Sequence, residues 1–447
     1  MFYRIILIYI VFTSLISCSE SKKENPDFAT DIAPIIRKNC SKCHVDGGAG
    51  PFNLVNYEDV ASKGKLIAYV TENKIMPPWP ADPEYTNFAG ETVLSHEEIN
   101  LIKKWVEQGA IPGDTANLEA YKKPENKVDL GKAGMTVYLP KPFLIPGDNS
   151  DRFYVVKFPI ELPYDTFIRA VEFVPHKKKL VHHMNAHLIN YEDGKKSNLH
   201  NGPYWINQDQ SESVRIHKDL DLLNDDGSYP VMTPSVSNYL PGSQFSFYPH
   251  GIGGFRIKKK SALYLNDIHF GPSAKEELDS SYFKIYFGKG PSERPVSEFQ
   301  IGTLGLSPVV PELIIPANQK KTFHIQFTVP QDISLLSIVP HMHLIGKKFL
   351  AYAIKPSGDT IRLIRINNWD FRWQYFYQPK KMLFVPRGSV IYVVGEYDNT
   401  SENPNNPFDP PREISEKNGS MKTTDEMFQL ILTYVPYQKG DEEMSLE

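Results

Sequence analysis

The hydrophobic positions near the N-terminus recur with the spacing of helices. Over 28–39, isoleucines three and four residues apart lie on one face of a predicted helix. A second predicted helix begins at the capping box Ser95–Glu98, where serine and glutamate side chains satisfy backbone N–H groups, and ends at Gly109. The spacing therefore predicts a small all-α domain over residues 27–117.

From residue 135 onward, short runs of alternating apolar and polar residues replace the helical spacing. Six of these runs are 153–157, 167–174, 323–329, 349–354, 361–366 and 390–394. Turn signals such as Lys355–Asp359 separate them, and 36 prolines against 28 glycines suit short strands joined by turns. The pattern is typical of antiparallel β-sandwiches, and roughly 310 residues suffice for two.

The expected fold class is therefore multidomain, with the all-α domain followed by two antiparallel, jelly-roll-like β-sandwich domains. A Lys- and Glu-rich linker over 118–134 precedes the sandwiches, which we place at 135–290 and 291–447. The formal net charge of -4 shows no excess of basic residues, so nucleic acid is not an expected partner. After Ile16 no apolar run approaches the ~20 residues of a membrane-spanning helix.

The first residues resemble a bacterial lipoprotein signal. Arg4 precedes an apolar stretch that ends in Leu15-Ile16-Ser17-Cys18, which predicts a signal peptide over 1–17 and lipidation of Cys18. Residues 18–26 would form a polar tether. The alternative is an ordinary signal peptide followed by a chance cysteine. We expect an exported protein, lipid-anchored to a bacterial membrane and facing the periplasm or the cell surface.

The three cysteines of the chain indicate a haem rather than a disulfide framework. Cys40 and Cys43 lie in Cys40-Ser41-Lys42-Cys43-His44, the attachment motif for a c-type haem, and Cys18 is assigned to lipid. No thiol is left over, so the domains are expected to be free of disulfides. A zinc site would need further ligands at cysteine spacing, and a redox disulfide is the other alternative.

The region 27–117 resembles a class I cytochrome c domain. Met76 lies in the proline-stiffened loop 74–80, where a thioether is well held. The resemblance implies covalent haem c on Cys40 and Cys43, with His44 as the proximal and Met76 as the distal iron ligand, and hence electron transfer. The alternative for Met76 is a core residue.

Five histidines of the second region have spacings that suit a metal. His341 and His343 are two residues apart, so on one strand they share a face and can bind one ion. The adjacent His182 and His183 point to opposite faces, so joint ligation requires a bulge or a strand end. His269 stands alone, and a surface or hydrogen-bonded core histidine is its alternative.

The segment 171–427 resembles the copper type II, ascorbate-dependent monooxygenases, the family of the peptidylglycine α-hydroxylating and dopamine β-monooxygenases. The resemblance is carried by the His-His-Met run at 182–184, the later histidine, the His-x-His element and the Asp-Glu-Met element at 425–427. Asn368–Gln374 and Tyr397–Thr400 also resemble bacterial members in which this core follows a cytochrome domain.

The resemblance implies two copper ions with different roles. The electron-transfer copper would be bound by His182, His183 and His269. The copper where O2 reacts would be bound by the catalytic set His341, His343 and Met427, and a thioether ligand favours Cu(I). Asp425 and Glu426 are expected to act outside the ligand set or to solvate a turn. Met421 is the alternative thioether, and His187 is either structural or a support for the first site.

The sequence also departs from the peptide-processing relatives. Val339 stands where they anchor the substrate carboxylate with an arginine, and Gln429 and Ile431 replace an asparagine and a tyrosine. A buried carboxylate without a cationic partner is costly, which argues against a C-terminal peptide substrate. Asp267 stands where a glutamine is often found, which puts a direct path between the coppers through that residue in doubt.

The sequence thus predicts a haem- and copper-containing monooxygenase that hydroxylates a C–H bond of an organic substrate with O2. Electrons would reach copper through the c-type haem from a periplasmic donor or an ascorbate-like reductant. The missing substrate anchors motivate an alternative, a surface-tethered copper and haem electron-transfer protein without hydroxylase turnover. A structural or adhesive lipoprotein with relic histidines is the third reading.

Overall fold

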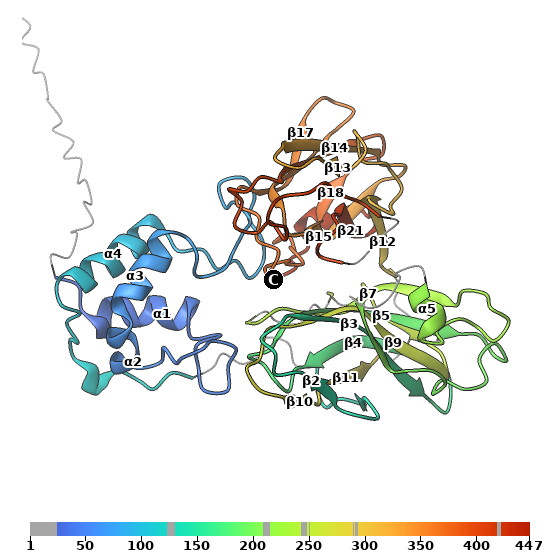
Figure 1. Cartoon of the computed structure of the whole chain (residues 1–447), viewed down its shortest axis with the longest axis horizontal. Helices are drawn as coiled ribbons and strands as arrows, with labels where there is room; N and C mark the ends of the chain where they lie inside the picture. Colours follow the sequence, from blue (N-terminus) through green and yellow to red (C-terminus); the bar gives the residue numbers. More distant parts are fainter. Residues whose placement is uncertain are drawn as a thin grey trace, which may run out of the picture.

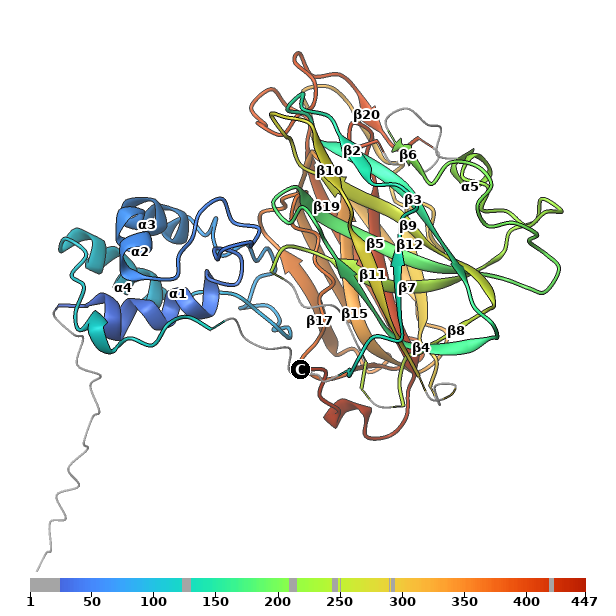
Figure 2. The same cartoon turned by 90° about the horizontal axis from the view of Figure 1, so that it is seen from below.

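The computed structural model describes residues 25–122, 130–208, 215–242, 248–249, 251–288, 290, 294–417 and 422–447. The predicted signal peptide, the lipidation site Cys18 and the alternative ligand Met421 lie outside the described residues. Figure 1 shows the N-terminal helices to one side of two groups of strands, which lie one above the other in this view. Figure 2 shows from below that the helices flank the strands.

The helices of the N-terminal part are short. They are η1 (Phe28–Ile32), α1 (Ala33–Asn39), α2 (Tyr57–Ser62), α3 (Gly64–Glu72), α4 (His96–Glu107) and the turn η2 (Thr115–Asn117). The capping box at α4 is formed, because Ser95 Oγ accepts from Glu98 N at 3.1 Å and Glu98 Oε2 from Ser95 N at 2.8 Å. Phe28, Ile36 and Trp105 are buried between these helices.

The fold class predicted for this part is wrong. The described chain is mostly β-strand in several sheets, its helices are few and short, and they form no clear small all-α cytochrome domain. The physical reason lies after α3, where the chain leaves the helices and packs on the C-terminal strands. There Ala81 and Phe88 are buried in the same core as Ile366 and Tyr377. The helical spacing of the two predicted helices could not predict that the chain between them packs on the C-terminal strands.

The first group of strands forms two facing antiparallel sheets. Its strands are β1 (Met135–Tyr138), β2 (Phe143–Ile145), β3 (Arg152–Glu161), β4 (Thr166–Val174), β5 (Val181–Tyr191), β6 (Trp205–Asn207), β7 (Val231–Tyr239), β8 (Phe255–Ile257), β9 (Lys260–Phe270), β10 (Glu277–Asp279) and β11 (Tyr282–Phe287). The sheet β6-β3-β9-β5-β7 faces the sheet β1-β11-β4-β8, and β10 pairs with β2. Alternate residues of both sheets, such as Phe158 and Phe283, fill the core between them.

The second group of strands repeats this arrangement. Its strands are β12 (Ser297–Gly302), β13 (Ile314–Ile315), β14 (Lys320–Thr328), β15 (Ile333–Met342), β16 (Gly346–Ile354), β17 (Thr360–Ile366), β18 (Leu383–Val385), β19 (Val390–Asp398), β20 (Ile414–Ser415) and β21 (Phe428–Pro436). The sheets β12-β21-β15-β18 and β14-β19-β16-β17 enclose a second core, and β13 pairs with β20. The turn η5 (Asp441–Glu443) follows β21.

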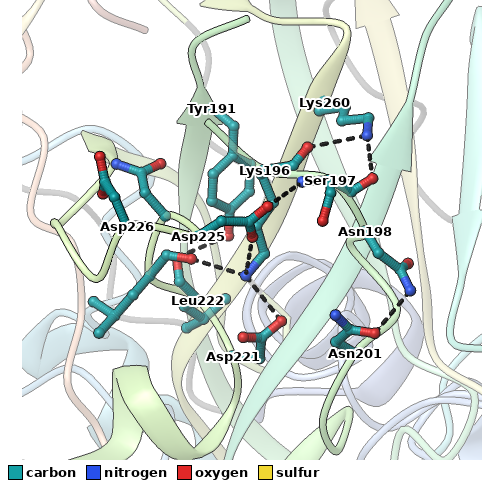
Figure 3. Close-up of polar contacts among 12 residues, drawn as sticks. Tyr191, Lys196, Ser197, Asn198, Asn201, Asp221, Leu222, Asp225, Asp226 and Lys260 are labelled. Atoms are coloured by element: carbon teal, nitrogen blue, oxygen red, sulfur yellow. Dashed lines mark hydrogen bonds and ion pairs between the residues drawn. The ribbon is translucent and has the colours of Figure 1, made fainter. Parts of the chain in front are cut away.

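Between β5 and β7 the chain adds β6 to the edge of the first sheet and then carries helix α5 (Ile216–Asp219). Buried lysines fix this part of the chain, as Figure 3 shows for Lys196, whose Nζ lies 2.8 Å from Asp221 Oδ2. Lys157 Nζ donates to the carbonyls of Asn201 and Leu220, both at 2.6 Å. These bonds satisfy backbone carbonyls that irregular structure would leave without partners.

Among the described residues, no helix combines the length and the apolar character needed to cross a membrane.

The shared packing of the N-terminal part and the C-terminal strands can be tested at Phe88, which is 1% exposed. Replacing Phe88 by alanine should lower the free energy of unfolding by about 3–5 kcal/mol, because the cavity opens in the core of the second group of strands. Chemical denaturation followed by the β-sheet circular dichroism signal measures this. The control Leu66→Ala shortens an exposed side chain of α3 and should change the free energy of unfolding by about 0.5 kcal/mol or less. An equally small effect at Phe88 would contradict the shared core.

Candidate metal centre

The first histidine cluster lies where β5 begins and β9 ends. His183 is paired with His269 across the two strands, and the register shifts between Val181 and His183. This irregularity at the start of β5 brings His182 close to His183 and His269, although adjacent residues on a regular strand point to opposite faces. The ring centroids of His182 and His183 lie 4.7 and 5.0 Å from that of His269.

Two carboxylates fix the protonation of this cluster. His183 Nε2 lies 2.7 Å from Asp267 Oδ2, and His269 Nε2 lies 2.7 Å from Asp151 Oδ1. Because an ionised carboxylate only accepts hydrogen bonds, each Nε2 carries the proton and each Nδ1 keeps a lone pair. Both Nδ1 atoms are buried and have no hydrogen-bond partner among the described residues. Orphaned buried lone pairs on neighbouring imidazoles fit a metal ion, with the carboxylates as supports.

His182 completes the cluster from the other side. Burial, and then the neighbouring His269, lower the pKa of His182 to about 4, so its ring is neutral and able to bind a metal at ordinary pH. A Cβ on Gly271 would lie 2.4 Å from His182 Nε2, so a side chain at position 271 would require this ring to move. One atom each of Asp151, His182 and His269 lies within 4.8 Å of the others, and this group of described residues does not include His183.

The second histidine cluster lies at the end of β15. His341 and His343 have ring centroids 5.1 Å apart. His343 Nδ1 lies 3.0 Å from the carbonyl oxygen of Asp425, to which it donates, and His341 Nδ1 lies 2.5 Å from Gln374 Oε1. Gln374 Nε2 donates to the carbonyl of Phe371 at 3.0 Å, which orients the amide so that its oxygen faces His341. Both histidines therefore keep their Nε2 lone pairs.

Met427 lies beside this pair. Met342 on β15 is paired with Phe428 on β21. His343 follows Met342 and Met427 precedes Phe428, so both residues lie next to this pair. Met427 is 1% exposed. Burial, and then His341, lower the pKa of His343 to about 3, so the ring is neutral. Two imidazoles and a thioether form a donor set that suits copper.

Glu426 locks the turn that carries Met427. Its carboxylate accepts from the backbone N–H groups of His343 and Ile345, both at 2.9 Å, and of Met427 at 3.2 Å. Burial raises the pKa of Glu426 to about 8, although these hydrogen bonds lower it. Glu426 is 1% exposed, so its role is to join the two ligand-bearing turns rather than to solvate one.

The segment from Trp369 to Tyr377, called the 369–377 segment below, lies between the two histidine clusters. The Phe371 ring centroid is 6.1 Å from that of His183 and 5.8 Å from that of His343. Burial lowers the pKa of His341, and the hydrogen bond to Gln374 and then the charge of Asp267 partly offset this. The two clusters are thus neighbours that belong to different groups of strands.

The Cys-His motif follows α1, and its histidine is arranged like the others. His44 Nδ1 donates to the carbonyl of Phe52 at 3.0 Å, which leaves the Nε2 lone pair for a metal. Burial, and then the neighbouring Cys43, raise the pKa of the Cys40 thiol to about 12. A redox-active cysteine needs a depressed thiol pKa, so this environment disfavours the redox disulfide. The residues fit a covalently attached haem.

The motif packs against the first group of strands and the 369–377 segment. A Cβ on Gly242, in the loop after β7, would lie 2.5 Å from Cys43 Sγ. The Cys43 thiol contributes to raising the pKa of Tyr375, after burial, and the Tyr375 hydroxyl donates to the carbonyl of Pro78 at 2.7 Å. Met76 lies two residues before Pro78, is partly buried, and stays a prediction as an iron ligand.

Sequence reasoning missed three residues of these centres: Asp151, Phe371 and Gln374. Asp151 is a lone acid before a strand, and no local pattern connects it with a histidine 118 residues away. Phe371 and Gln374 lie in the motif Asn368–Gln374, whose resemblance to bacterial monooxygenases was the available signal. His187 is buried and its Nδ1 donates to the carbonyl of Thr233 at 3.0 Å, as expected for a structural residue.

Comparisons with known proteins give no family. No protein-family model and no curated protein matches the chain. Among solved structures, PNGF-II is 8% identical with a TM-score of 0.25 over 68% of this chain, and the match spans 65% of the length of PNGF-II. A structure of the infectious bursal disease virus Gx strain is 9% identical with a TM-score of 0.15, over 67% of this chain and 78% of that chain.

The fit of the first cluster to a metal can be tested at Gly271. Gly271→Ala should weaken Cu(II) binding about 10–100-fold, because the new methyl group displaces the His182 ring. Competition with a chelator of known affinity measures this on the full chain. Gly290→Ala, where a Cβ meets nothing within 4 Å, is the matched control and should bind as the parent does. Equal affinities of the two variants would remove His182 from the ligand set.

Proposed function

We propose that this chain is a haem- and copper-containing monooxygenase that hydroxylates a C–H bond of an organic substrate with O2. The observation that carries the proposal is the pair of neighbouring histidine clusters, in which the chain engages one ring nitrogen each of His183, His269, His341 and His343. Two such sets side by side suit a reaction that needs two electrons at one place. Copper would supply one-electron redox chemistry toward O2, and haem on Cys40 and Cys43 would supply electrons singly.

The residues of the chain have separate tasks in this proposal. His182, His183 and His269 would hold the electron-transfer copper, with Asp267 and Asp151 orienting two of the rings. His341, His343 and Met427 would hold the copper that meets O2. Gln374 and the Asp425 carbonyl orient those two histidines through Nδ1. Phe371 fills the space between the sites with an apolar ring, which keeps water from the gap and strengthens electrostatic interactions across it.

The surroundings of His341 favour a substrate without a carboxylate. Val339 is two residues before His341 on β15, so both side chains lie on the same face of the sheet. Val339 is 7% exposed and is paired with Ile431 on β21. An anionic group bound there would lose its water and meet no cation from these two residues. We therefore assign the site a neutral organic substrate.

The remaining parts of the proposal concern partners and location. The chain would be exported and anchored to a bacterial membrane through lipid on Cys18, facing the periplasm or the cell surface. A periplasmic donor or an ascorbate-like reductant would reduce the haem. The competing function is a copper and haem electron carrier without turnover, and O2 uptake that depends on an added neutral organic compound separates the two.

The metal content of the full chain, matured with haem and supplied with copper, tests the proposal first. We expect two coppers per haem iron, because each histidine cluster presents one complete ligand set. Met427→Ile should lower the ratio of Cu(I) to iron to one and leave the haem content unchanged, since only one site contains a thioether. Elemental analysis of copper and iron measures both. Haem iron without stoichiometric copper in the parent chain would overturn the monooxygenase.

The absorption spectrum of the haem tests Met76. Met76→Ala should abolish the weak long-wavelength band of methionine-ligated ferric haem and shift the haem to a less oxidising potential, because loss of the thioether destabilises ferrous iron. Met382→Leu is the matched control, since Met382 is buried in a different cluster of the second group of strands. An unchanged spectrum of the Met76 variant would exclude this residue as the ligand.

A further inference from the structure

Asp267 supports the first histidine cluster although it belongs to neither predicted ligand set. It lies on β9, two residues before His269, but its carboxylate bonds to His183 on the neighbouring strand β5 at 2.7 Å. The Asp267 side chain is 21% exposed, yet its Oδ1 atom is buried and has no hydrogen-bond partner among the described residues. The chain thus holds a carboxylate with one engaged and one unengaged oxygen beside the first cluster.

Asp267 differs from Asp151 in its surroundings. Asp151 makes the equivalent bond to His269 Nε2, also at 2.7 Å, but its side chain is 51% exposed. Water screens the charge of an exposed carboxylate strongly, whereas a charge in a poorly hydrated gap acts over a longer distance. Of these two supporting carboxylates, Asp267 is the less exposed, so its charge is the less screened by water.

We propose that Asp267 is a positioning residue that, through His183, sets the reduction potential of the copper held by His182, His183 and His269. The inference rests on the proposed function. A carboxylate on Nε2 makes the imidazole a stronger donor through Nδ1, and its negative charge stabilises Cu(II) more than Cu(I). The reduction potential of a copper held there would therefore be low. At the second site the Met427 thioether would favour Cu(I), which corresponds to a higher potential.

The direction of electron flow follows from this difference. A copper held by His182, His183 and His269 would give up an electron more readily, and one held by His341, His343 and Met427 would accept it more readily. The reductant named in the proposed function would resupply the first site. Asp267 would thus act through its charge rather than as a covalent path between the sites.

The experiment compares Asp267→Asn with the parent chain and with Asp151→Asn. Asparagine keeps the shape of the side chain and an oxygen that accepts from His183 Nε2, but it removes the charge. We expect Asp267→Asn to weaken Cu(II) affinity at the first site about 10–100-fold and to change Cu(I) affinity much less. Competition with chelators specific for each oxidation state gives both affinities on the full chain, and their ratio reports the reduction potential. Asp151→Asn should change the ratio by a smaller factor.

A second pair of variants controls for misfolding. Asp267→Glu and Asp267→Gln have side chains of equal length and differ in charge, so the charge alone should separate their Cu(II) to Cu(I) affinity ratios. Equal ratios for that pair, or a parent-like ratio in Asp267→Asn, would overturn the role of Asp267 while the copper sites stand. A parent chain that binds no copper at the first cluster would overturn the proposed function, and this inference with it.

Discussion

The contacts of the 369–377 segment are the constraint on which the arrangement of the three candidate centres depends. Phe371 packs between His183 of the first group of strands and His343 of the second. Gln374 orients His341, and the next residue, Tyr375, bonds to the carbonyl of Pro78 in the N-terminal part. The nine residues of this segment thus contact both histidine clusters and Pro78 in the N-terminal part.

A second principle is shared by all the candidate ligands whose tautomer the structure fixes. Each such histidine has one nitrogen engaged by an acceptor of the chain: a carboxylate for His183 and His269, a carbonyl for His44 and His343. The acceptors differ in charge, and this has a chemical consequence. Charged acceptors occur at the proposed electron-donating copper site, and neutral ones at the proposed O2 site and at the proposed haem histidine. Ligand type and supporting charge would therefore favour Cu(II) at the first proposed site and Cu(I) at the second.

The sequence predicted the local parts of this molecule and missed what joins them. Alternating runs indicated the strands, and the requirement for a bulge or strand end at His182 and His183 is met at the start of β5. The fold class failed because helical spacing in two segments says nothing about the chain between them. There Phe88 is buried against Tyr377, a contact between residues too far apart for any periodicity to report. Asp151 was missed for the same reason, since its partner lies on a distant strand.

The packing of the N-terminal part also bears on how electrons would reach copper. A freely tethered haem domain would have to find the copper sites by diffusion, and its encounter would depend on linker length. Here the Trp79 ring packs at a tilt against that of Tyr375, with ring centroids 5.1 Å apart, and Ala81 pairs with Ile366 at the edge of a sheet. These contacts bury apolar surface and so hold the Cys-His motif against the strands. A haem on Cys40 and Cys43 would then stand at a fixed distance from His341, and the proposed electron supply would be intramolecular and independent of protein concentration.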